Sequence, residues 1–122
     1  MERVEEFCLD GKKFIYIDFS GLRNKDDFFG QIQLVEPVIS KYNENSLYAI
    51  VNIENVRLEL DLKEIFVKFL EHNKPYINNS VIIGIDGVKK MSASAVAKLS
   101  GRSNFSYAYS REQAIEYVLK LQ

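Results

Sequence analysis

The sequence predicts an α/β domain: a mixed, mostly parallel sheet of four or five strands, an N-terminal β-hairpin and about four helices. Apolar runs of strand length, at residues 46–53 and 81–85, alternate with amphipathic segments of helix length. Such alternation is typical of parallel strands joined by right-handed helical crossovers. A length of 122 residues fits a single domain over residues 1–122.

Composition narrows the class of protein further. Hydrophobic residues make up 47% of the chain, with eight Phe and seven Tyr, which favours a packed core over disorder. Sixteen basic and seventeen acidic side chains give a net charge of −1, so bulk charge gives no support for nucleic-acid binding. The single cysteine excludes an internal disulfide. No apolar run approaches the ~20 residues of a bilayer span, and the first residues lack a signal-peptide core, so we expect a cytoplasmic protein.

The chain opens with the pattern of a β-hairpin. Residues 4–8 and 13–19 flank Asp10-Gly11, a dipeptide suited to the positive φ angles of a type I′ turn. The second of these strands is apolar on both faces, which predicts a strand covered on both sides.

The first helix is predicted from its cap. Asn24 can accept hydrogen bonds at the helix start, and Asp26 and Asp27 favour the positive dipole end. Apolar residues then recur at helical spacing: Phe28, Ile32, Val35 and Ile39. Pro37 lies inside this pattern, where a proline costs about 3 kcal/mol. We therefore expect a kink between Gln33 and Pro37, or two short helices.

The middle of the chain predicts a strand followed by a second helix. Residues 46–53 form the strand, and residues 54–60 are either its extension or a loop. Asp61 and Glu64 resemble a capping box. The helix that follows has one wide apolar face: Leu62, Ile65, Phe66, Phe69 and Leu70. It should end near Asn73, because Pro75 disfavours helical backbone at the residue before it.

The last third predicts two strand–helix units. Residues 81–85 form a buried strand, followed by a turn at Asp86-Gly87 and a helix of small residues that stops at Gly101. Residues 105–109 form a short aromatic strand. Ser110 and Gln113 form a capping box for the final helix, whose inward residues are Ala114, Ile115, Val118 and Leu119.

The turn at Asp86-Gly87 is a candidate binding site. Free N–H groups at the following helix start, with Lys89 and Lys90 beside them, suit an anion, and Gly87 would allow its close approach. The spacing matches neither a phosphate-binding loop nor a dinucleotide fingerprint. The alternative is a plain tight turn in which Asp86 caps the helix.

A second candidate site lies where the strands end. Asp18 interrupts an apolar strand near its carboxyl end, which is where open α/β sheets bind ligands. Its carboxylate either accepts hydrogen bonds from the Ser20-Gly21 turn or lines a pocket. The candidate binding residues are therefore Asp18, Asn52, Glu54, Asp86, Gly87, Lys89 and Lys90.

No residue pattern predicts a catalytic, metal or cofactor site. His72 is the only histidine, and Cys8, in a predicted edge strand, is interpreted as a small packing residue. Ser92 and Ser94 either let their helix lie close to the sheet or present hydroxyls as ligands or phosphorylation sites. An enzyme using Asp18 or Cys8 is the weakest hypothesis, because acid–base chemistry needs a second positioned group.

Four segments, FIYIDFSGL, HNKPY, VIIGIDGVKK and AVAKLSGR, resemble the STAS/SEC14-like (SpoIIAA-like) bacterial proteins, which are related to anti-sigma-factor antagonists. The resemblance covers about Lys13 to Leu119. It implies a STAS-like fold and a function by binding, to a protein partner or to a second copy. The alternative that the family name suggests is a small anionic or lipid-like ligand held near Lys89 and Lys90.

The resemblance also implies where the chain departs from the antagonist branch. In that branch a serine at the start of the helix after the second core strand is phosphorylated and switches partner binding. Residues 52–63, NIENVRLELDLK, contain no serine or threonine. A phosphoserine switch at that position is therefore excluded by residue type.

Overall fold

The computed structural model describes residues 3–22, 24–56, 60–84 and 105–121, which form one mixed five-stranded sheet and three helices. The strands are β1 (Val4–Leu9), β2 (Lys12–Asp18), β3 (Leu47–Asn52), β4 (Ile77–Ile83) and β5 (Phe105–Tyr107). The helices are α1 (Lys25–Ile39), α2 (Leu60–Asn73) and α4 (Arg111–Leu119). The predicted α/β class is confirmed.

The strands lie in the sheet in the order of the chain, β1-β2-β3-β4-β5. β1 pairs antiparallel with β2, and every other neighbouring pair is parallel. The two residues that join β1 to β2, Asp10 and Gly11, have φ angles of 51° and 77°. These are the positive values that a type I′ turn requires.

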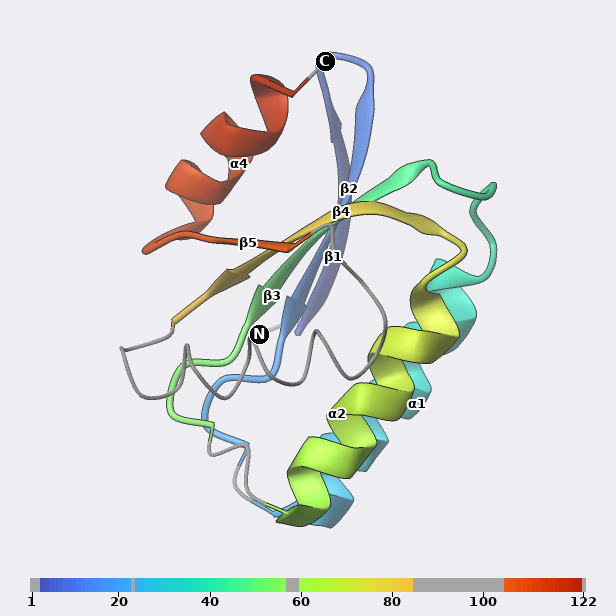
Figure 1. The fold of residues 1–122 in the computed structure, drawn as a ribbon, viewed down its shortest axis with the longest axis vertical. Helices are drawn as coiled ribbons and strands as arrows, with labels where there is room; N and C mark the ends of the chain where they lie inside the picture. The colour runs from blue at the N-terminus through green and yellow to red at the C-terminus, as the bar shows by residue number, and fades with distance from the viewer. Residues whose placement is uncertain (1–2, 23, 57–59, 85–104, 122) are drawn as a thin grey trace.

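Helices cover both faces of the sheet (Figure 1). α1 and α2 lie side by side on one face, and α4 lies on the other. The core under α1 and α2 is centred on stacked and edge-on aromatic rings from the residue that follows β2 and from both helices: Phe19, Phe28, Phe66 and Phe69. The smaller core under α4 contains Phe14, Ile50, Val81, Ile83, Ala114 and Val118. β2 and β3 are therefore covered on both sides, as their apolar sequences predict.

α1 begins as predicted and is one helix. The Asn24 side chain accepts a hydrogen bond from the Asp27 backbone N–H at 2.8 Å, which confirms the cap. The expectation of two short helices is wrong, because α1 runs unbroken through Pro37 to Ile39. Pro37 lies in the last turn, where little helix remains to be disrupted, and buried Val35 and Ile39 on either side of it hold the backbone in place.

α2 corrects one prediction and confirms another. The helix begins at Leu60, so Asp61 lies inside it, whereas a cap needs non-helical backbone; the predicted capping role of Asp61 is wrong. The helix ends at Asn73 as predicted, and the Tyr76 N–H closes the following turn onto the Asn73 carbonyl at 3.0 Å. Before α2, the backbone turns at residues 53–56, with Asn55 at φ 60°, so the chain after β3 is a loop there.

β4 begins at Ile77, four residues before its predicted start at Val81. Ile77 is buried in the larger core and pairs with Leu47, and this packing outweighs the poor strand preference of Asn78 and Asn79. The predicted helix after this strand, with the Asp86-Gly87 turn, lies outside the described residues.

α4 begins at the cap that the sequence predicts. Ser110 Oγ accepts from the Gln113 N–H at 3.1 Å, and Gln113 Oε1 accepts from the Tyr109 N–H at 2.7 Å. Ala114 and Val118 are buried as predicted. None of the helices in the described part of the chain combines the length and apolar character needed to cross a membrane.

Candidate functional site

The carboxyl ends of β2 and β3 bring together two of the predicted binding residues. Asp18 and Asn52 are the final residues of their strands and are direct partners in the parallel ladder. Because side chains alternate between faces, both lie on the α4 side of the sheet, the side of Phe14 and Ile50. Glu54 follows Asn52 by two residues and is exposed. Three of the seven predicted residues thus gather at this edge.

Asp18 holds the turn that follows its own strand. Its Oδ1 accepts a hydrogen bond from the Ser20 backbone N–H at 2.8 Å, and the residue is only 7% exposed. This confirms the structural interpretation of Asp18, in which the carboxylate orders the Ser20-Gly21 turn.

Asn52 holds the turn after β3 in the same way, and its side chain also contacts β2. Its Oδ1 accepts from the Glu54 backbone N–H at 3.0 Å, and its Nδ2 donates to the Tyr16 hydroxyl at 3.0 Å. Tyr16 was not among the predicted residues, because in sequence it reads as one more aromatic residue of a buried strand.

Gly84 brings the end of β4 against this turn. Its φ is +79°, and a Cβ at this position would lie 2.7 Å from Asn52 Oδ1 and 2.7 Å from the Glu54 backbone nitrogen. Only glycine meets both the angle and the close approach. The sequence places Gly84 beside a turn but does not reveal which part of the chain it touches.

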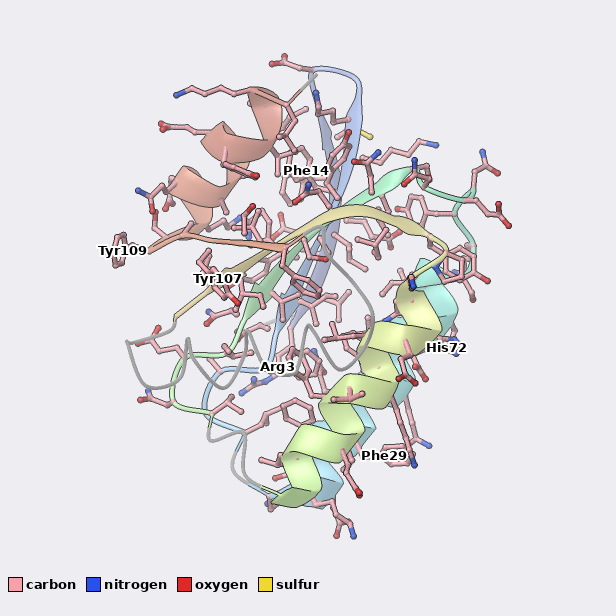
Figure 2. The ribbon with its side chains drawn as sticks, in the orientation of Figure 1. Arg3, Phe14, Phe29, His72, Tyr107 and Tyr109 are labelled. Atoms are coloured by element: carbon pink, nitrogen blue, oxygen red, sulfur yellow. The ribbon has the colours of Figure 1, made fainter. Side chains whose placement is uncertain are left out.

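Two further residues that the sequence analysis missed fix the end of β2 from the other side. Arg3 donates through Nη1 to the carbonyls of Asp18 and Ser20, at 3.2 and 2.9 Å, and lies at this end of the sheet in Figure 2. Gln31, buried in α1, donates through Nε2 to the carbonyls of Arg3 and Asp18, at 3.1 and 3.3 Å. The end of β2 and the turn after it are therefore held by three side chains, those of Asp18, Arg3 and Gln31.

Arg111 connects α4 to the same face of the sheet. Its guanidinium lies 4.9 Å from the Phe7 ring and 4.6 Å from the Tyr16 ring, and Nη1 pairs with Glu5 Oε2 at 2.8 Å. This hydrogen bond holds the pKa of the Glu5 carboxyl below its ordinary value and raises the pKa of Arg111. Tyr16 therefore links Arg111 of α4 to Asn52, which holds the turn after β3.

The other predicted binding residues, Asp86, Gly87, Lys89 and Lys90, lie outside the described residues, as do Ser92 and Ser94. The pocket expected between the Asp86-Gly87 turn and Asp18 stays a prediction.

The two isolated reactive side chains do not join this edge. Cys8 lies in β1, the outer strand of the sheet, as predicted, but it is exposed, so its interpretation as a packing residue is wrong. His72 is exposed in the last turn of α2. Within the described ranges, no group of three or more His, Cys, Asp or Glu side chains could hold a metal ion.

No protein-family model matches the chain, and no curated protein sequence is similar enough to count as a match.

Proposed function

We propose that the chain is a non-enzymatic, STAS-like interaction module that binds a protein partner through the carboxyl end of its sheet. One observation carries the proposal: the two polar side chains in the strand ends, Asp18 and Asn52, both hold backbone turns in place. A carboxylate engaged in this way is a positioning group, whereas acid–base catalysis needs a proton-transfer group aimed at substrate. The turns at this end of the sheet are thus held in fixed positions by side-chain hydrogen bonds.

The absence of a phosphorylatable residue in residues 52–63 supports binding without the phosphoserine switch of the antagonist branch. Glu54 is the exposed member of the edge and stands beside the Gly84 contact. Its carboxylate is the group that a partner meets first.

Reversing the charge of Glu54 tests this surface. The purified protein is immobilised and partners are captured from an extract of the source organism, then quantified by mass spectrometry. Glu54→Arg should lower recovery of the partner by about tenfold or more, as expected when one interface contact becomes repulsive. Glu116→Arg, the same change on an exposed position of α4, serves as the matched control.

Equal capture by both variants would contradict the proposed surface. Turnover in a broad substrate panel that is abolished by Asp18→Asn would contradict the non-enzymatic role.

The alternative is a small anionic or lipid-like ligand at the same end of the sheet, since parallel sheets bind ligands there. It depends on Lys89 and Lys90. A nucleotide, phosphate or lipid present at 100 times its dissociation constant should add about 2.7 kcal/mol to stability in a thermal-shift assay. Replacing both lysines by alanine should remove that gain.

A further inference from the structure

The outer edge of β1 presents backbone groups in a regular row. β1 is the terminal strand of the sheet and pairs with β2 over six consecutive residues. The Asp18 N–H donates to the Arg3 carbonyl at 2.8 Å, and hydrogen-bonded positions alternate along an antiparallel pair. Val4, Glu6 and Cys8 therefore turn their backbone N–H and C=O groups outward. In the described part of the chain, no strand pairs with this edge.

This edge lacks the usual protection against pairing with another strand. Native edges are commonly blocked by proline, by bulges or by free charges. β1 has no proline, and its pairing with β2 is continuous. Its two carboxylates are engaged within the chain: Glu5 pairs with Arg111 at 2.8 Å, and Glu6 accepts from the Tyr42 hydroxyl at 2.6 Å.

Charge then selects one way for two copies of β1 to pair. In such a pair, residues whose backbone groups point outward must lie opposite each other. Two antiparallel arrangements then overlap over most of the strand: in one Glu6 lies opposite Glu6 of the second copy, and in the other Phe7 lies opposite Phe7. Centring on Glu6 sets two carboxylates directly opposite each other, which is destabilising. Centring on Phe7 sets Glu6 opposite Cys8 of the second copy and Glu5 opposite Leu9.

The same pairing extends an aromatic stack that already exists. Phe7 stacks on Phe14 of β2, with ring centroids 4.9 Å apart and planes within 3°. In the Phe7-centred pair the two Phe7 residues face each other without backbone hydrogen bonds, where Cα atoms approach to about 4.5 Å. The four rings, Phe14 and Phe7 of one copy followed by Phe7 and Phe14 of the other, then form one continuous row. Leu9, which is 40% exposed, also gains cover.

We propose that the protein forms a symmetric dimer in which two β1 strands pair antiparallel about Phe7. The two sheets, each of five strands, become one continuous sheet. This surface is built from residues other than the proposed partner-binding residues, so the two proposals fail independently.

Mass measurement with a backbone variant tests the dimer. Light scattering after size exclusion should give twice the chain mass of 14.1 kDa. Cys8→Pro removes an outward N–H and leaves the β1–β2 bonds intact, as edge prolines do, so it should give the monomer mass with an unchanged circular dichroism spectrum. Cys8→Ser, the control, should remain a dimer. A wild-type monomer at the highest soluble concentration, or a dimeric, folded Cys8→Pro variant, would overturn the proposal.

Crosslinking tests the pairing itself and keeps Phe7 in place. In a Cys8→Ser background, Glu5→Cys combined with Leu9→Cys sets cysteines opposite each other, within the roughly 4.4–6.8 Å Cα separation of a disulfide. Mild oxidation should then give a covalent dimer. Leu9→Cys alone should not, because its two copies lie four residues apart along the strands, about 13 Å. A dimer that fails to crosslink in the double variant, or that crosslinks equally in the single one, would show that the pairing about Phe7 is wrong.

Discussion

Gly84 is the residue on which the geometry of the candidate site depends most directly. It lets the end of β4 touch the turn that Asn52 organises, and both its φ and its surroundings exclude a side chain. Gly84→Ala should therefore lower the free energy of unfolding by about 2–4 kcal/mol, from left-handed backbone strain together with overpacking. Urea denaturation measures the change.

Gly11 provides the matched control for this prediction. Its φ is +77°, close to that of Gly84, but a Cβ there would meet nothing within 4 Å. Gly11→Ala should carry only the backbone strain, about 1 kcal/mol. Equal losses for the two variants would mean that the contact with Asn52 contributes nothing.

At the scale of elements, α4 depends on its first turn. Ser110 and Gln113 satisfy backbone N–H groups at its start, and a helix of nine residues has few other bonds to hold it. Ser110→Ala should cost about 1 kcal/mol of stability, and Ser110→Asn, which keeps an acceptor, should cost much less. Thermal unfolding of the three proteins checks this. Indistinguishable curves would show that the packing of Ala114 and Val118 alone holds the helix.

The elements that the sequence predicts well are those with a local signal. Asn24, Ser110 and Pro75 each act on backbone within a few residues, and the structure places the ends of the helices accordingly. The early start of β4 was missed because Asn78 and Asn79 have poor strand preference, and only the pairing of Ile77 with Leu47 overrides it.

The candidate site was only partly predictable, because most of its contacts join residues that are far apart in the sequence. Asp18 and Asn52 could be placed at one edge because parallel strands end together. The roles of Tyr16, Gly84 and Arg111 come from contacts between distant parts of the chain, and nothing in their neighbouring residues signals those contacts.

At the scale of the whole molecule, the Glu5–Arg111 pair joins the first strand to the last helix across 106 residues. The pKa of the Glu5 carboxyl is lowered in the folded state from an ordinary value of 4.5. The pair therefore stabilises the fold above that pH, and its contribution is lost as the pH falls through the lower, folded-state pKa.

Glu5→Gln should accordingly reduce stability slightly at neutral pH, and the gap from wild type should close below pH 4.5. Urea midpoints measured across this range test the sign. Glu116→Gln, on an exposed residue of α4, controls for the loss of one negative charge. A gap that widens in acid would contradict the role of Arg111.

The order of the strands has a consequence for synthesis of the protein. Among the strands in the described ranges, each lies beside the one made just before it, and none must insert between two that are already paired. Folding can therefore follow the chain as it leaves the ribosome. The exception is the face covered by α4, where Phe14, Ile50 and Val81 stay uncovered until α4 has been made. A nascent chain paused before α4 would expose this apolar face, which favours aggregation at that stage of synthesis.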